Sequence, residues 1–245
     1  DIYDNYIEWA AKWLDEAYRV LSRNGSMVIF GGIQFRDVKS GDLIDIIHHV
    51  RHNTKFKLIN TIIWRYKNGM SAHRYFANRH EEVIWLAKTN DYYFDLDSVR
   101  EPYSEKDLEA ALKDKRLNPE NTIKGKNPTN VWEINRLNGN SKERVGHPTQ
   151  KPVAIIERFI QALSYPGSVV LDFFAGSGTV GRVCISRGRH CLMCDSNKSS
   201  IGYFNRHLEL MKELGQNTDY IHISNAEELF TNLKGEQQDE RETAI

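Results

Sequence analysis

Cysteine, net charge and long apolar runs are all scarce in this sequence. Its three cysteines, which lie in one short stretch of the 245 residues, exclude a disulfide framework and favour a reducing cytoplasm. No apolar run reaches the roughly 20 residues that a membrane-spanning helix needs, and no signal-peptide pattern opens the chain. The 33 Lys and Arg equal the 33 Asp and Glu, so any case for nucleic-acid binding depends on where the basic residues lie.

The cysteines give little support for a metal site. Cys191 and Cys194 form a C-x-x-C pair, but no second pair or ligand cluster near them completes a zinc site. On the strand expected there, residues three apart point to opposite faces. We therefore interpret the cysteines as packing residues and expect no metal.

Apolar periodicity predicts an α/β protein. Helical spacing occurs over residues 4–22, 43–50, 105–115 and 152–163, and in segments that end near 186 and 214. Short apolar runs predict strands at 27–30, 58–64, 82–86, 131–134, 168–173, 191–194 and 220–223. From Pro152, expected as the first helical residue, helices and strands alternate as in a parallel sheet covered by helices.

Two regions fall outside this pattern. Residues 101–146 combine low periodicity with many Asn, Pro and Lys, which is typical of a functional segment. Residues 234–245 form a charged tail that we expect to be frayed. The chain opens at Asp1 without an initiator methionine and enters a helical pattern at once, so we interpret it as a fragment.

A glycine-rich turn follows the strand expected at 168–173. Residues 172–181 read Asp-Phe-Phe-Ala-Gly-Ser-Gly-Thr-Val-Gly and lead from that strand into a helix. Glycines allow a sharp turn and a close approach to a ligand, and the free N–H groups at the helix start favour an anion. Asp195, at the end of the next strand, can accept hydrogen bonds from ribose hydroxyls. This pattern fits NAD and S-adenosylmethionine equally well, and a purely structural turn is the third alternative.

A second motif precedes the helix that leads to the glycine-turn strand. Residues 146–152 read Gly-His-Pro-Thr-Gln-Lys-Pro. Lys151 supplies a cation and Thr149 a hydroxyl beside a helix N-terminus, and together they suit a carboxylate. A methionine carboxylate fits such a site, whereas a pyrophosphate would be expected at the glycine-rich turn. The motif therefore favours S-adenosylmethionine, with a plain loop before a helix as the alternative.

Together these motifs resemble a known family. His147-Pro-Thr-Gln-Lys-Pro152 followed by Asp172-Phe-Phe-Ala-Gly-Ser-Gly178 is similar to the β-class amino-DNA methyltransferases of restriction–modification systems, whose cofactor half follows the catalytic half. Further stretches extend the resemblance over nearly the whole chain: 68–72, 76–81, 115–119, 127–132 and 136–141. The resemblance implies a Rossmann-like sheet with helices on both faces in permuted order, S-adenosylmethionine as cofactor, and duplex DNA of the GAATTC type as substrate.

The resemblance also implies roles for single residues. His147, Thr149 and Lys151 would hold the methionine end of the cofactor, and Asp195 its ribose. Asn225 would lie near the adenine ring. The residues of the glycine-rich turn that would line the cofactor are Phe173, Ala175, Gly176, Ser177 and Gly178.

The family's catalytic Asp-Pro-Pro-Tyr motif does not occur in this sequence. The resemblance places it immediately before Asp1, on a strand between the glycine-turn strand and the strand at 27–30. Without that strand, two interior sheet edges would carry unpaired backbone groups, which are costly when buried. We therefore expect an upstream segment or a second polypeptide to fill the position, and we name no catalytic residue in this chain.

Basic and aromatic residues alternate from Thr61 through His80, where no acidic residue occurs. Such a loop suits phosphate contacts and stacking on an extruded base, although a solvated loop over aromatic core residues has the same composition. A second basic stretch lies within residues 101–146. The expected DNA contacts are Arg65, Lys67, Asn68, Arg74, Arg79, His80, Arg136, Lys142 and Arg144.

The leading hypothesis is a site-specific, cytoplasmic DNA methyltransferase that acts on N6 of adenine by base flipping. We expect a catalytic half at residues 1–100, a target-recognition region at 101–146, a cofactor half at 147–233 and a tail at 234–245. The alternatives are N4-cytosine methylation, a catalytically incomplete fragment that binds cofactor and DNA, and an NAD-dependent oxidoreductase.

Overall fold

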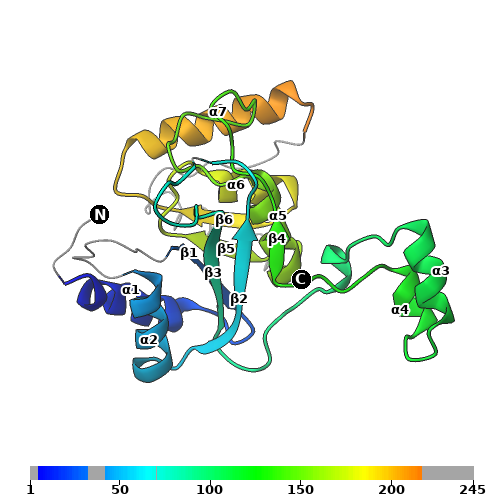
Figure 1. Ribbon diagram of the computed structural model, residues 1–245. Helices are drawn as coiled ribbons and strands as arrows, with labels where there is room; N and C mark the ends of the chain where they lie inside the picture. The colour runs from blue at the N-terminus through cyan, green and yellow to red at the C-terminus, as the bar shows by residue number, and fades with distance from the viewer. Residues whose placement is uncertain (1–4, 33–41, 70, 217–245) are drawn as a thin grey trace, which may run out of the picture.

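Two β-sheets and the helices that cover them make up the fold. The computed structural model describes residues 5–32, 42–69 and 71–216 (Figure 1). One sheet has the order β1-β3-β2-β4, from β1 (Ser26–Gly31), β2 (Lys57–Arg65), β3 (His80–Ala87) and β4 (Val131–Glu133). The second sheet pairs β5 (Val169–Asp172) with β6 (His190–Met193). The helices are α1 (Tyr6–Val20), α2 (Leu43–Asn53), α3 (Glu105–Lys113), α4 (Pro119–Ile123), α5 (Val153–Leu163), α6 (Thr179–Ser186) and α7 (Ser199–Glu213), with a short 3-10 helix η1 (Asp97–Val99).

Strand direction differs between the two halves of the chain. β3 runs antiparallel to both β1 and β2, whereas β4 is parallel to β2 and β5 is parallel to β6. The parallel β5–β6 pair, with α6 as its crossover, confirms the arrangement predicted from the alternating pattern after residue 152.

Helices cover both faces of the larger sheet. Val83 and Trp85 of β3 pack into one apolar cluster with residues of α5, and Ile84 and Leu86 pack into another with residues of α1 and α2. Figure 1 shows α1 and α2 on one side of the strands and α5, α6 and α7 on the other. Because successive strand residues point to opposite faces, the unbroken apolar run of β3 reflects burial on both faces.

Most of the expected elements are confirmed, with three differences. Pro152 caps α5 instead of forming its first turn, since its ψ of 141° is extended and the helix begins at Val153. The short elements η1 and α4 were not predicted. The strand expected at 220–223 and the tail at 234–245 lie outside the described residues.

The expected single sheet is divided in the described part of the chain. There β1 pairs only with β3, and β5 pairs only with β6. One edge of β1 and one edge of β5 therefore have no strand partner among the described residues.

Helices α3 and α4 form an arm that stands away from the sheets (Figure 1). An antiparallel bridge between Glu101 and Lys126 closes the base of the arm, with N···O distances of 3.0 and 2.7 Å. Arg100 supports this base by donating to the Gly125 carbonyl at 3.0 Å and to Asn127 Oδ1 at 2.6 Å. In the part of the chain described, no helix is long and apolar enough to cross a bilayer.

Candidate cofactor site and nucleic-acid surface

The glycine-rich turn connects the end of β5 to the start of α6. Gly176 and Gly178 have φ of +49° and +77°, a left-handed conformation that glycine adopts with little strain. The Gly178 N–H donates to the Ala175 carbonyl at 2.7 Å and closes the turn, and the Ala175 N–H donates to the Cys194 carbonyl at 3.1 Å, just beyond β6. The turn is thereby held at the carboxyl ends of two parallel strands, which is where open α/β sheets bind ligands.

Two of the glycines also lie close to side chains of neighbouring elements. A Cβ on Gly178 would lie 2.9 Å from Phe204 of α7, and a Cβ on Gly181 would lie 2.6 Å from Met193 of β6. Both distances are shorter than a normal carbon contact. The G-x-G-x-x-G spacing therefore serves close approach of α6 to α7 and β6 as well as the turn itself.

Asp195 is bound to the turn. Its Oδ2 accepts from the Gly176 N–H at 2.7 Å, and its Oδ1 accepts from the Asn197 N–H at 2.8 Å. Burial alone would raise the pKa of Asp195, but these N–H donors, the Ser200 hydroxyl and the neighbouring His147 together outweigh it, so the pKa is lowered and the carboxylate is charged at neutral pH. A carboxylate has about four acceptor positions, so the group can still accept a hydrogen bond from a ribose hydroxyl besides those from Gly176, Asn197 and Ser200.

The 146–152 loop is held from within by buried groups. The Gln150 side chain is buried, accepts from the Val145 N–H at 2.9 Å and donates to the Glu143 carbonyl at 2.8 Å. A carboxylate oxygen of Glu143 accepts from the Val153 N–H at 2.6 Å, where α5 begins, and burial raises the pKa of Glu143. Arg206 of α7 donates to the Val145 carbonyl at 2.7 Å.

This loop and the glycine-rich turn lie against each other. The His147 ring is 3.4 Å from where a Cβ of Gly176 would be and meets the Tyr203 ring edge-on at 5.4 Å. Thr149 Oγ1 lies 3.4 Å from His147 Nδ1. The Thr179 hydroxyl donates to the Lys151 carbonyl at 3.3 Å. The residues predicted for opposite ends of one cofactor are therefore neighbours in space.

The Lys151 ammonium points at the sheet. It lies 2.8 Å from Glu81 Oε2 and over the rings of Trp64 and Phe30, with centroid distances of 5.3 and 5.6 Å. Both charged side chains are about a quarter exposed. The positive charge of Lys151 thus already has an acidic partner, which the sequence did not suggest.

The aromatic residues of the turn pack on α1. Phe173 contacts the apolar cluster of α1 and α2 and lies 5.9 Å from the Trp13 ring. Phe174 is 55% exposed and touches the rings of Trp9 and Trp13. Burial raises the pKa of Asp172, at the end of β5, and the nearby Asp195 adds to the effect. Asn225 lies outside the described residues.

A family model described as a DNA methylase (N6_N4_Mtase) matches residues 1–206. The chain belongs to this DNA methylase family. Type II methyltransferase M.HpaI of Haemophilus parainfluenzae is 34% identical over 201 residues, which are 81% of this chain and 58% of that protein. M.ScaI of Streptomyces caespitosus is 33% identical over 195 residues, 76% of this chain and 61% of that protein. The methylase chain thus spans about three fifths of the length of these two relatives.

A third relative and two solved structures complete the comparison. The DNA adenine methyltransferase YhdJ of Escherichia coli (strain K12) is 32% identical over 213 residues, 84% of this chain and 68% of that protein. The PvuII cytosine-N4-specific DNA methyltransferase has a TM-score of 0.65 at 18% identity, over 95% of this chain and 78% of that one. M1.HpyAVI in its complex with SAM has a TM-score of 0.59 at 24% identity, over 85% of each chain. At these identities the two structures show the α/β methyltransferase fold alone, and they confirm the predicted fold class.

Acidic side chains neutralise part of the basic charge of the loop around residues 65–80. Arg65 and Lys67 lie 2.7 and 2.5 Å from the carboxylate of Glu133, on the neighbouring strand β4. His80 lies 3.1 Å from Glu82. The exposed side chains of this segment include Arg74, and Phe76 is 98% exposed.

The remaining predicted DNA contacts divide into structural and exposed groups. Asn68 donates to the Arg136 carbonyl at 2.8 Å and accepts from the Arg136 N–H at 3.1 Å, and the guanidinium of Arg136 lies over the Tyr66 ring. Arg144 donates to the His147 carbonyl at 3.1 Å, so its guanidinium supports the 146–152 loop. Lys142 is exposed, and Arg79 is half-buried.

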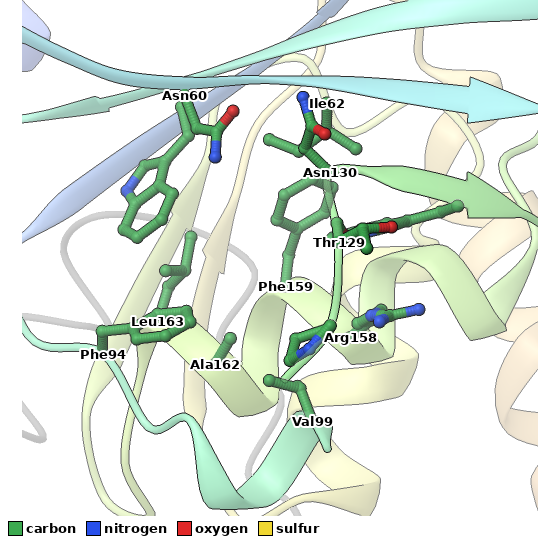
Figure 2. Close-up of a pocket in the computed structure, with 13 residues that line it drawn as sticks. Asn60, Ile62, Phe94, Val99, Thr129, Asn130, Arg158, Phe159, Ala162 and Leu163 are labelled. Atoms are coloured by element: carbon green, nitrogen blue, oxygen red, sulfur yellow. The ribbon is translucent and has the colours of Figure 1, made fainter. Parts of the chain in front are cut away.

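The chain also has a small cavity away from both loops. Figure 2 shows Asn60, Asn130, Phe159 and Arg158 among the residues around it, between β2, the segment leading into β4, and α5. None of the residues predicted for cofactor or DNA lines it. Its volume is about 90 Å³.

Reasoning from the sequence missed the polar residues behind the two loops. Glu143, Arg182 and Arg206 each contribute a charge or hydrogen bond there, and Thr179 and His207 lie between them. Thr179 directly follows Gly178 and could have been included with the motif. The roles of Arg206 and His207 in α7 could not be predicted from the sequence, because the residues that they contact are far away in the chain.

Proposed function

We propose that this chain belongs to an S-adenosylmethionine-dependent methyltransferase that modifies N6 of adenine in duplex DNA. The observation that carries the proposal is the contact between the 146–152 loop and the glycine-rich turn. Family membership supports DNA methylation and decides against the NAD-dependent oxidoreductase. M1.HpyAVI, which shares the fold, has been solved with SAM bound.

The residues at the two loops fit the proposed cofactor. Asp195 keeps capacity to accept from a ribose hydroxyl, and the glycines with positive φ leave the backbone of the turn uncovered by side chains. Thr149 is exposed beside the start of α5 and can donate to a carboxylate. Lys151 can share its ammonium between that carboxylate and Glu81, because an ammonium has three donors. When bound, the cofactor supplies a methyl group on a sulfonium.

Adenine in a site of the GAATTC type is the proposed target because the stretches that carry the resemblance are similar to the RsrI adenine methyltransferase. YhdJ, a DNA adenine methyltransferase, is also a relative. N4-cytosine methylation stays as the second candidate because both reactions act on an exocyclic amine, and the PvuII enzyme of that specificity shares the fold.

Residues 66–69 and 71–80 are the proposed surface for the target base and its phosphates. Phe76 is almost fully exposed, although burying an aromatic ring is favourable, and Arg74 is exposed two residues before it. A flat apolar ring with cations beside it suits stacking on a base. Arg79, His80 and Lys142 would add phosphate contacts.

The arm and the residues that follow it, 101–146, are the proposed target-recognition region. Between Arg100, Tyr103 and α4 the arm has a hollow of about 450 Å³, whose walls also include the amides of Asn118 and Asn121. Asparagine and arginine are common readers of base edges. Arg100 and Asn118 also make hydrogen bonds that hold the arm together.

In this proposal the catalytic motif comes from outside the described strands. The Asp-Pro-Pro-Tyr motif does not occur in the sequence, and β1 and β5 each have one edge without a partner in the described part of the chain. We propose that a strand carrying this motif, from an upstream segment or a second polypeptide, lies between these two edges.

The test is transfer of labelled methyl from S-adenosylmethionine to unmethylated duplex DNA that contains GAATTC, followed by nucleoside analysis. Label in N6-methyladenine is the expected result for the protein with its catalytic strand. Label in N4-methylcytosine would replace the adenine proposal by the cytosine one. A folded chain that binds S-adenosylmethionine without transferring methyl would support the incomplete fragment.

A further inference from the structure

Four buried polar side chains lie behind the glycine-rich turn. Ser177, Thr179, Arg182 and His207 are between 0 and 7% exposed. They come from the turn, from α6 and from α7. Buried polar groups need hydrogen-bond partners, so the order of donors and acceptors among them can be worked out.

The Thr179 hydroxyl is the centre of this group. Its Oγ1 lies 2.9 Å from Ser177 Oγ, 3.3 Å from the Lys151 carbonyl oxygen and 3.4 Å from His207 Nε2. A hydroxyl has a single proton to donate, and a carbonyl can only accept. Thr179 therefore donates to Lys151 and accepts from the other two groups.

His207 must then be neutral, with its proton on Nε2. Its Nδ1 lies 3.5 Å from Arg182 Nη1, and a guanidinium can only donate. Burial lowers the pKa of His207 to about 4, and the charge of Arg182 adds to this effect. Arg182 is in turn opposite Glu143, whose carboxylate caps α5. The donors thus run in one direction, from Arg182 through His207 and Thr179 to Lys151.

We infer that Thr179, supported by His207, is a positioning residue that couples the two loops of the proposed cofactor site. Among the described residues, the bond from Thr179 to the Lys151 carbonyl is the hydrogen bond that joins the 146–152 loop to the start of α6. The same hydroxyl accepts from Ser177, inside the turn. This hydroxyl therefore links the two loops directly, in addition to the contact of His147 with the turn. The cofactor part of this inference rests on the proposed function.

Thr179→Val is the direct test, because valine keeps the shape of threonine and removes the hydroxyl. Thr179→Ser keeps the hydroxyl, and Ser186→Ala is a matched control that removes a hydroxyl at the other end of α6, where it donates to the Val183 carbonyl. Amide hydrogen exchange of residues 146–152 and 173–178 without ligand reports the coupling. Equilibrium dialysis with S-adenosylmethionine reports cofactor affinity.

We expect Thr179→Val to raise exchange in both segments together and to weaken S-adenosylmethionine binding roughly tenfold. Thr179→Ser and Ser186→Ala should stay close to the parent protein in both measurements. Exchange that rises in 173–178 alone, or in neither segment, would overturn the coupling. Increased exchange in both segments with unchanged affinity would overturn its role in the cofactor site.

A failure of the proposed function gives a different result. If the parent protein binds no S-adenosylmethionine but Thr179→Val still raises exchange in both segments, the coupling holds and the cofactor assignment fails. If circular dichroism shows that Thr179→Val does not fold, His207→Leu takes its place, since it removes the donor behind Thr179. Exchange in His207→Leu that matches the parent protein would overturn the inference.

Discussion

Replacing Gly178 with alanine tests why the turn requires glycine. The φ of Gly178 is +77°, and a Cβ there would lie 2.9 Å from Cβ and Cδ2 of Phe204. A left-handed conformation costs a non-glycine residue about 1–2 kcal/mol. Overpacking a well-filled site costs a further ~1–3 kcal/mol, and Phe204 cannot move its Cβ without moving α7. We therefore expect Gly178→Ala to lower the free energy of unfolding by about 2–5 kcal/mol.

Gly188→Ala is the matched control. Gly188 also has a positive φ, +67°, but a Cβ there would have no atom within 4 Å. It should therefore cost only the backbone part, about 1–2 kcal/mol. Urea unfolding followed by circular dichroism measures both variants, and equal slopes against urea show that the comparison concerns the native state. The difference between the variants measures the contact with Phe204.

Equal losses of stability in Gly178→Ala and Gly188→Ala would refute this reasoning. They would show that α6 and α7 are not in close contact at Phe204. In that case the spacing of the glycines would have to be explained by the ligand and the turn alone.

Other contacts lead to three further expectations. The pKa of His207 is lowered to about 4 from an unfolded value of about 6.5, so the unfolded chain takes up a proton first as the pH falls. The parent protein should therefore lose up to about 3 kcal/mol of stability between pH 6.5 and pH 4, and His207→Gln should lose less. Identical pH profiles of the two proteins would contradict this expectation. Glu133→Gln should release Arg65 and Lys67 from their ion pairs and so strengthen DNA binding at low salt, with a steeper salt dependence. Unchanged affinity in a filter-binding assay would mean that these cations do not face DNA. Phe76→Ala should leave stability within about 0.5 kcal/mol of the parent but weaken DNA binding, and a large loss of thermal stability would show that the ring is buried.

The elements with a long apolar pattern could be predicted from the sequence. Strand β3 has five consecutive buried residues, Val83 to Ala87, because helices cover it on both sides, and its apolar run shows this directly. Helix α5 has a stripe of buried residues on one face, which gives clear helical periodicity. Helix α4 was missed because five residues are too few to show a period, although Asn118 caps it and Pro119 begins it.

The two motifs of the candidate site could be found from sequence, but not the way in which their side chains are paired. Glu133 neutralises Arg65 and Lys67 because β4 lies beside β2, and that pairing joins residues about 68 positions apart. Lys151 meets Glu81 for a similar reason. The role of Gly181 in packing against Met193 also depends on a tertiary contact. The fold determines which distant residues meet, so a local sequence pattern cannot predict these contacts.

Titration of the chain with S-adenosylmethionine, with NAD in a parallel experiment, tests the central claim most directly. The claim is that the 146–152 loop and the glycine-rich turn form one cofactor site. We predict saturable binding of S-adenosylmethionine to one site per chain, no binding of NAD, and markedly weaker binding in Asp195→Ala, whose carboxylate faces the turn. Saturable binding of NAD by a folded chain that does not bind S-adenosylmethionine would contradict the claim.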